Sequence, residues 1–288
     1  MASRSFSRAL FGGAAAMLLI LVLAYAFSEP EPPPAAPKDF DPSNFVAGRP
    51  RLDAPYVATG YEVVDAMLAM AEVEPDDFVI DLGSGDGRIL IAAARSHGAR
   101  GFGVDIDPAR IRESTANARA AGVAHRVSFR REDLFETELG EADVLTLYLL
   151  PEINLQLRPR ILSEMRPGTR VVSNMYDMGD WRPERRQRIG TATIYMWIVP
   201  ARVAGRWTLT DGERQAQLDI EQEYQVVRGS FTAGGRSGRI EQGQLTGSRI
   251  RFVADLGGGR RAYEGRVVGD RIEPRRASAG WSAERVAS

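Results

Sequence analysis

The sequence predicts a two-domain protein: an α/β domain with a largely parallel sheet and helices on both faces, followed by a small antiparallel all-β domain. Three observations lead to this expectation. An apolar strand runs into a glycine-rich turn at residues 79–89. Strand-like and helix-like segments then alternate up to residue 200, at the spacing of βαβ units. From residue 201 onward, short alternating strands and glycine turns replace the helical pattern.

The segment V-I-D-L-G-S-G-D-G-R-I at residues 79–89 predicts a strand, a tight turn and the start of a helix. Glycine at positions 83, 85 and 87 lets the backbone approach a ligand where a Cβ would collide. A dinucleotide fingerprint would read G-x-G-x-x-G without a nearby carboxylate. Here Asp81 and Asp86 flank the glycines, so the turn suits a cationic ligand better than a pyrophosphate.

The remaining elements of the first domain follow from the same alternation. Strands are expected at residues 100–105, 127–134, 143–151 and 170–173, helices at 89–95, 108–121 and 153–165, and a last antiparallel strand at 191–199. In such sheets a ligand lies at the carboxyl ends of the strands. Asp105 ends the second strand, where an acid can take two ribose hydroxyls, and Asp133 ends the third. Asp107 precedes Pro108 and is expected to cap the next helix.

Over roughly residues 55 to 200, these motifs resemble the class I S-adenosylmethionine-dependent methyltransferases. The resemblance implies that Asp81 and the Gly83–Gly87 turn wrap the methionine part of S-adenosylmethionine. It implies that Asp105 holds the ribose hydroxyls and that Asp133, with the backbone N–H of Leu134, reads the adenine edge. An alternative for Asp133 is that it simply begins a turn. The implied cofactor-binding residues are Thr59, Tyr61, Asp81, Gly83, Ser84, Gly85, Asp86, Gly87, Asp105, Ile106, Asp133 and Leu134.

A narrower resemblance concerns D-L-G-S-G-D-G-R together with the upstream Pro55-Tyr56-Val57-Ala58-Thr59. Both look like the lysine N-methyltransferase group that includes the ATP synthase c-subunit enzyme. In that group, Thr59 and Tyr61 would lie near the cofactor carboxylate.

The methyl acceptor is expected to bind beside the ends of the fourth and fifth strands. A sulfonium methyl is already activated, so positioning alone can supply about 7–11 kcal/mol of the barrier. Tyr148 and Pro151 are the candidate catalytic residues; Tyr148 has the alternative of a core strand aromatic. The other acceptor-facing candidates are Glu152, Asn154, Asn174, Tyr176 and Asp177. The chain lacks N-P-P-Y or D-P-P-Y after the fourth strand, so adenine and glutamine acceptors lose support.

These residues predict an S-adenosylmethionine-dependent methyltransferase that acts on a protein nitrogen, with lysine as the favoured acceptor. A small-molecule or lipid methyltransferase at the membrane is the first alternative. The second is a non-catalytic ligand-binding protein that keeps the fold. A dinucleotide-dependent oxidoreductase is disfavoured by Asp81 and the glycine spacing.

The composition excludes several other kinds of partner and site. The net charge of −1 gives no case for a nucleic-acid partner. The chain has no cysteine, which excludes disulfides and zinc–thiolate sites. His97 and His125 lack acidic partners at ligand spacing, so no metal is expected. Lys38 is the only lysine, and the other basic residues are arginines.

The N-terminus predicts a targeting or anchoring element. Arg4 and Arg8 precede an uncharged run at residues 9–28, which is long enough to cross a bilayer core of about 30 Å. Cleavage after a signal peptide, near Ala24-Tyr25-Ala26, is the alternative. The charge bias places the bulk of the chain outside the cytoplasm, in tension with the cytoplasmic supply of S-adenosylmethionine. The expected regions are an anchor at 1–28, a Pro-rich linker at 29–50, a methyltransferase domain at 51–200 and a β-domain at 201–288.

The β-domain contains an internal echo. Residues 243–250 match residues 265–272 at an offset of 22, and both copies carry a two-residue hairpin signal, Gly-Ser or Gly-Asp. The aromatic side chains expected on its buried face are Trp207, Phe231, Phe252, Tyr263 and Trp281. We expect an antiparallel meander or a barrel-like sandwich that acts as a scaffold or presents a substrate.

Overall fold

The computed structural model describes residues 57–287, which belong to the compact unit Asp39–Ser288. The expected anchor (1–28) and linker (29–50) lie outside the described residues. Among the helices of residues 57–287, none combines the length and the apolar character that a membrane crossing needs.

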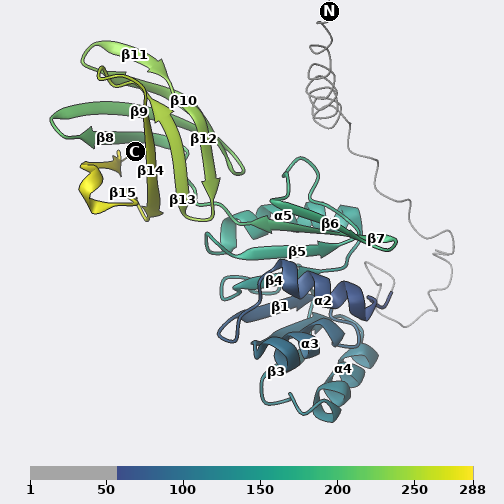
Figure 1. Ribbon diagram of the computed structural model, residues 1–288. Coiled ribbons are helices and arrows are strands. Elements are labelled where there is room, and N and C mark those ends of the chain that lie inside the picture. Colours follow the sequence, from purple (N-terminus) through teal and green to yellow (C-terminus); the bar gives the residue numbers. More distant parts are fainter. Residues whose placement is uncertain (1–56, 288) are drawn as a thin grey trace, which may run out of the picture. The chain divides into compact units, whose positions relative to one another are not determined.

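The first sheet has seven strands in the order β3-β2-β1-β4-β5-β7-β6 (Figure 1). They are β1 (Phe78–Leu82), β2 (Arg100–Asp105), β3 (Val127–Arg131), β4 (Val144–Leu147), β5 (Arg170–Asn174), β6 (Arg185–Ile189) and β7 (Ala192–Ile198). Strands β1 to β5 pair in parallel, and β7 runs antiparallel to both of its neighbours. The largely parallel sheet is therefore confirmed.

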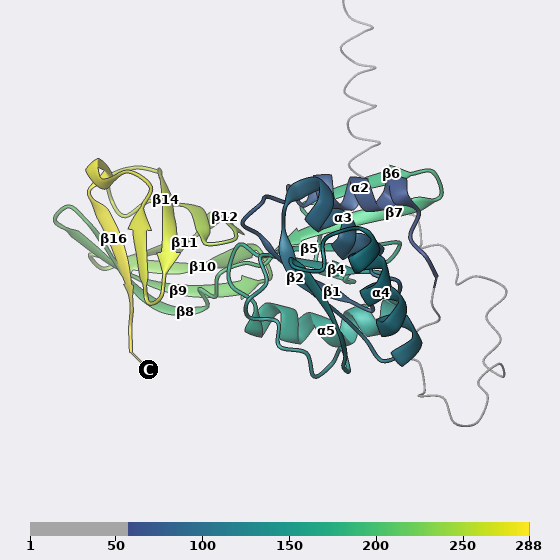
Figure 2. The same cartoon turned by 90° about the horizontal axis from the view of Figure 1, so that it is seen from below.

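Helices cover both faces of this sheet, as Figure 2 shows. Alternate residues of each strand point to opposite faces. Val79 joins a core with α2 (Tyr61–Met70), α3 (Arg88–His97) and α4 (Pro108–Ala120). Its neighbour Ile80 joins a second core with α5 (Pro151–Glu164). The α/β class with helices on both faces is confirmed.

The order of the strands locates the site. The chain proceeds from β1 outward to β3 and then returns to place β4 on the other side of β1. Neighbouring loops at such a switch point diverge and leave a crevice at the carboxyl ends of the strands. The glycine turn after β1 and Tyr148 after β4 lie at this point.

Several elements differ from the sequence expectation. β3 ends at Arg131 and β4 at Leu147, so Asp133 and Tyr148 lie in the loops that follow these strands. Two elements were not expected: helix α2 and the edge strand β6. In β6, four of the five residues are polar and exposed, so its sequence lacks the alternation that marks a half-buried strand.

The second sheet has nine antiparallel strands in the order β11-β10-β12-β13-β14-β15-β16-β8-β9. They are β8 (Gly205–Asp211), β9 (Arg214–Glu223), β10 (Val226–Ala233), β11 (Arg236–Arg239), β12 (Glu241–Thr246), β13 (Arg249–Ala254), β14 (Arg261–Val268), β15 (Arg271–Pro274) and β16 (Trp281–Arg285). An additional pairing of β9 with β10 closes the sheet into a barrel. The barrel-like prediction is therefore confirmed.

The repeated segments form the β12–β13 and β14–β15 hairpins, each joined by the two predicted residues. All five predicted aromatic side chains are buried in the core of this domain. Phe252, Tyr263 and Trp281 contact one another with ring centroids 5.1 to 6.3 Å apart. Side chains thus fill the barrel interior.

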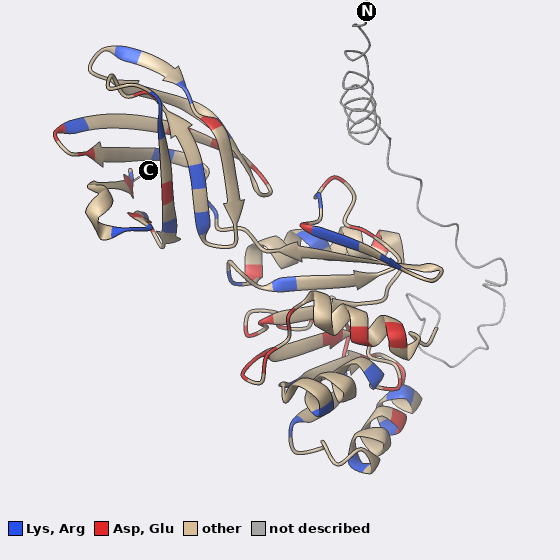
Figure 3. Ribbon diagram, in the orientation of Figure 1, with Lys and Arg blue, Asp and Glu red and all other residues tan. Residues whose placement is uncertain are grey.

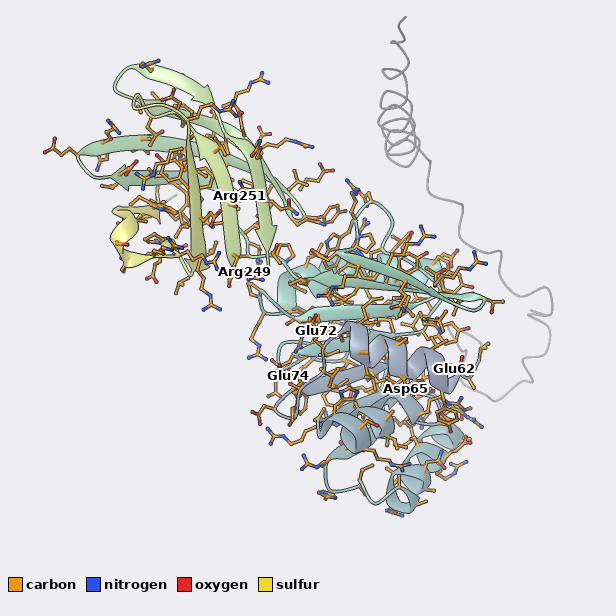
Figure 4. All side chains as sticks on the ribbon, viewed as in Figure 1. Glu62, Asp65, Glu72, Glu74, Arg249 and Arg251 are labelled. Atoms are coloured by element: carbon orange, nitrogen blue, oxygen red, sulfur yellow. The ribbon has the colours of Figure 1, made fainter. Side chains whose placement is uncertain are left out.

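Charge is distributed unevenly over the first domain (Figure 3). Helix α2 exposes Glu62 and Asp65, and Glu72 and Glu74 follow it, as the labels of Figure 4 show. Arginines line the neighbouring strand β6, where Arg185 pairs with Glu72 at 2.6 Å. Residues 57–287 contain arginine but no lysine, and Figure 4 labels two of these arginines, Arg249 and Arg251 of β13.

Candidate active site

A cavity opens at the carboxyl ends of β1, β2 and β4, where the topology predicts one. The predicted residues that line it are Thr59, Asp81, Gly83, Ser84, Asp86, Asp105, Ile106, Asp133, Leu134 and Tyr148. Residues that were not predicted also line it: Val57, Ala58, Arg88, Ile89, Val104, Asp107, Arg110, Glu132 and Leu149. Residues from three strand ends therefore meet in one place.

Four predicted residues lie outside this lining. Gly85 and Gly87 are buried within the glycine turn and do not line the cavity. Tyr61 is 69% exposed, and the guanidinium of Arg88 lies 5.2 Å from its ring centroid. Pro151 is the first residue of α5. Tyr61 and Pro151 thus flank the cavity and do not form its wall.

The glycine turn has the conformation and the close contacts that glycine permits. Gly83, Gly85 and Gly87 have φ values of 75°, 54° and 82°, in the left-handed region. A Cβ on Gly87 would lie 2.5 Å from the Phe129 ring, and one on Gly83 would lie 2.8 Å from Leu149. The turn therefore keeps this conformation only with glycine at these positions.

Asp81 is a buried carboxyl at the wall of the cavity. Its Oδ1 accepts a hydrogen bond of 2.7 Å from Thr146 Oγ1, whereas its Oδ2 is buried without a partner among the described residues. Burial raises the pKa of Asp81 to about 7, although the bond from Thr146 acts in the opposite direction. A buried acceptor without a donor is costly, so this oxygen suits a cationic N–H donor from a ligand.

Asp105 ties two loops together. Its Oδ2 accepts from the backbone N–H of Gly85 at 3.0 Å, and its Oδ1 accepts from that of Asp107 at 2.9 Å. Burial raises the pKa of Asp105, and these two bonds oppose the rise. Each oxygen keeps a lone pair for a ligand hydroxyl. Asp107 caps α4 as predicted, since its Oδ1 accepts from Ala109 N at 2.7 Å.

Asp86 forms an ion pair with Arg88, a residue that sequence reasoning did not select. The two side chains approach to 2.6 Å, and Arg88 Nη1 also donates to the carbonyl oxygen of Thr59 at 2.7 Å. Arg88 thereby joins the glycine turn to the segment before α2. The sequence signal was weak, because an arginine two residues after an aspartate is common on exposed surfaces.

Asp133 both begins a turn and lines the cavity. Its Oδ1 accepts from Phe135 N at 2.8 Å, so it begins a turn. It also lines the cavity with Leu134.

Tyr148 connects the cavity to the end of β5. The register pairs Leu147 with Ser173, so Tyr148 and Asn174 follow at the same edge of the sheet. Burial raises the pKa of Tyr148, and Tyr176 adds to the rise. The hydroxyl of Tyr148 therefore stays protonated at neutral pH.

A strained turn follows Asn174. Met175 has a φ of 70°, and the N–H of Tyr176 donates to the carbonyl of Asn174 at 2.9 Å, which defines a γ-turn. Asn174 is 3% exposed, and its Oδ1 has no partner among the described residues. Strain of this kind clusters at functional sites.

Asn154 holds this turn from α5. It is fully buried, and its Nδ2 lies 3.2 Å from Ser173 Oγ, 3.3 Å from the carbonyl oxygen of Tyr176 and 3.4 Å from that of Asp177. Among the predicted acceptor-facing residues, Asn154 is thus a positioning residue.

Asn154→Ala is expected to destabilise the protein by about 1–3 kcal/mol, because it leaves buried acceptors without a donor. Urea unfolding measures this change. Gln156→Ala, on the exposed face of the same helix, is the matched control and should change stability by less than about 0.5 kcal/mol. Equal stability of the two variants would show that the three hydrogen bonds of Asn154 Nδ2 do not stabilise the turn.

The residues of the cavity fit S-adenosylmethionine. The unpartnered Asp81 Oδ2 suits its amino group, the Asp105 carboxylate suits vicinal hydroxyls, and the glycine turn leaves the backbone free of Cβ atoms. Ser84 Oγ is a further buried group without a partner among the described residues.

Comparison with known proteins gives the same assignment. The ANTKMT methyltransferase domain matches residues 81–185. A protein-lysine N-methyltransferase of Saccharolobus islandicus (strain REY15A) is 40% identical over 150 residues, covering 50% of this chain and 93% of the Saccharolobus protein. The adenine nucleotide translocase lysine N-methyltransferase of Mus musculus is 30% identical over 149 residues, covering 52% of this chain and 65% of the mouse protein.

A solved structure extends the comparison to the fold. It is described as an RNA methyltransferase from Salinibacter ruber in complex with S-adenosyl-L-homocysteine, and it is 50% identical to this chain. The match covers 51% of this chain and 96% of that one, with a TM-score of 0.50. The chain therefore belongs to the S-adenosylmethionine-dependent methyltransferases, in the family of the Saccharolobus protein-lysine N-methyltransferase.

Proposed function

We propose that this enzyme transfers methyl groups from S-adenosylmethionine to the ε-amine of lysine in a protein. The observation that carries the proposal is the 40% identity to a protein-lysine N-methyltransferase, which extends over 93% of that protein. The charge of the domain supports it. Residues 57–200 contain 17 arginines and 22 acidic residues, a net charge of −5, which favours a basic acceptor.

The cofactor-binding roles are part of the proposal. Asp81 Oδ2 would accept hydrogen bonds from the cofactor's amino group, and Asp105 would hold its ribose hydroxyls. Asp133 and the Leu134 N–H would bind the adenine edge. Support comes from the way these side chains share one cavity. Bound S-adenosylmethionine supplies an activated sulfonium methyl group.

Tyr148 and Asn174 are the proposed acceptor-binding residues. A lysine amine must arrive neutral to use its lone pair, and a half-buried site lowers its pKa. The oxygen of the protonated Tyr148 hydroxyl and the unpartnered Asn174 Oδ1 can then accept hydrogen bonds from the N–H groups of the amine. These bonds would direct the lone pair of the amine toward the cavity. Positioning of this kind can supply about 7–11 kcal/mol of the barrier.

RNA is the second candidate acceptor, because the Salinibacter relative is described as an RNA methyltransferase. Nucleic-acid binding relies on basic surfaces that neutralise phosphates. The net charge of −5 of residues 57–200 opposes such an interaction and favours protein over RNA.

Incubation of the full-length protein with methyl-labelled S-adenosylmethionine tests the proposal. The acceptors are a cell protein extract, total RNA and lipid vesicles. We expect label in protein, and acid hydrolysis should release it as ε-N-methyllysine.

The matched control is the same extract after exhaustive acetylation of its amines, which turns the lysine amines into amides without a free lone pair and should abolish the labelling. Tyr148→Phe should lower the rate of transfer with little change in cofactor Kd. Label in RNA or lipid, or in the blocked extract, would contradict a lysine acceptor.

Tethering to a membrane by residues 9–28 completes the proposal. The length of the apolar run and the arginines before it support a single-pass anchor. Recovery of the intact chain in the membrane fraction, and its release by detergent but not by salt, is the expected result.

A further inference from the structure

The segment between β5 and β6 carries acceptor-side residues without regular secondary structure to hold them. It spans residues 175–184 and begins with the strained turn at Met175. Tyr176 is in this segment, and Trp181 is buried at its centre. On the side of the first domain, Arg158 Nη1 donates to the carbonyl oxygen of Met178 at 2.6 Å.

The β9–β10 turn of the barrel contacts the same segment. The ring of Tyr224 stacks on Trp181, with centroids 6.0 Å apart and an interplanar angle of 16°. The Tyr224 hydroxyl donates to Asp180 Oδ1 at 3.0 Å. Gln225 Nε2 donates to the carbonyl oxygen of Arg182 at 2.8 Å. These groups belong to one compact unit, Asp39–Ser288.

The backbone of this turn is unfavourable for tyrosine. The β9–β10 loop has two residues, and Tyr224, the first of them, has a φ of 51°. The other two-residue hairpin loops of the barrel begin with Gly212, Gly234, Gly247 and Gly269, whose φ values are 61°, 53°, 58° and 56°. Glycine adopts this conformation without strain, whereas a side chain makes it costly. Tyrosine at this position must therefore be stabilised by its contacts.

We propose that Tyr224 and Gln225 brace the β5–β6 segment, so that the barrel sets the position of the acceptor-side residues. The inference rests on the proposed function, because the segment follows Asn174 directly, which the proposed function assigns to acceptor binding. Tyr224 acts through Trp181 and Asp180, which makes it a positioning residue. The barrel thereby contributes to acceptor binding without contacting the reacting atoms.

Tyr224→Gly separates this role from barrel stability. Glycine removes the stack and the hydrogen bond but suits the left-handed turn, so the melting temperature should be unchanged or higher. We expect kcat/KM for the protein acceptor to fall about tenfold or more, mainly through KM, because small misplacements of acceptor groups are costly. The Kd for S-adenosylmethionine should not change. Tyr224→Phe, which loses only the bond to Asp180, should have an intermediate effect.

Glu213→Gly, at the second position of the β8–β9 turn, is the matched control and should behave as wild type. Hydrogen exchange provides a readout that needs no acceptor: amides of residues 175–184 should exchange faster in Tyr224→Gly. Wild-type kinetics and wild-type exchange in Tyr224→Gly would overturn the inference while leaving the function intact. Absence of protein labelling by the wild-type enzyme would instead overturn the proposed function.

Discussion

Asp81→Asn is expected to remove the pH dependence of cofactor binding and to weaken binding at pH 8. Burial raises the pKa of Asp81 to about 7, and the cofactor's ammonium group selects the ionised form. At pH 6, about one tenth of the molecules carry the carboxylate, so the wild-type Kd should be about tenfold higher than at pH 8. Titration calorimetry in two buffers of different ionisation enthalpy measures both the Kd and the proton released on binding.

The stability of the cofactor-free protein should fall with rising pH, whereas the affinity for the cofactor should rise. The folded pKa of Asp81 lies above its usual value, so the folded state binds more protons than the unfolded state. The stability due to this group is present at low pH and is lost as the pH rises through about 7. At pH 8, Asp81→Asn should therefore raise the Tm while it weakens binding. A wild-type Kd that stays constant from pH 6 to pH 8 would contradict the assignment of Asp81.

Asp105→Ala is expected to cause the second large loss of cofactor affinity. The variant loses a ligand for the ribose hydroxyls and also the acceptor for the N–H groups of Gly85 and Asp107. The glycine turn then loses its link to the loop after β2. We expect the Kd to rise at least about tenfold, and the free energy of unfolding to fall by about 1–3 kcal/mol. Calorimetry and urea unfolding measure the two changes.

Asp77→Ala is the matched control for this prediction. Asp77 accepts from Glu74 N at 2.7 Å and pairs with Arg170 at 2.5 Å, before the start of β1 and outside the cavity lining. It should lose comparable stability with an unchanged Kd. An Asp105→Ala protein that binds the cofactor as tightly as wild type would remove Asp105 from the site.

The fold was predictable where local patterns and topology agree. Buried strands such as 79–82 and 144–147 are continuous apolar runs around single polar positions, and glycine or proline marks the helix boundaries at Gly87, Gly98 and Pro108. β6 could not be predicted in this way. Its strand conformation depends on pairing with β7, because its own side chains are mostly exposed arginines.

The cavity was predictable for residues fixed by strand ends, and less so for residues that arrive from elsewhere. Asp81 and Asp105 lie at the carboxyl ends of β1 and β2, and Asp133 follows the end of β3, so the parallel sheet brings them together. Arg88 and Arg110 lie in the first turns of α3 and α4, where only the folded chain directs them to the cavity. The role of Asn154 was also hidden, since a buried amide on a helix gives no sequence signal for its partners.

The absence of lysine from residues 57–287 limits methylation of the enzyme by itself. Within this range, the cationic side chains of both domains are those of arginine. Guanidinium groups stay protonated and have no free lone pair, unlike a lysine amine. An enzyme that methylates lysine amines therefore presents no such amine on either of its folded domains. Lys38 is the one lysine of the sequence, so methyl label found on a lysine of the enzyme itself should map to this residue.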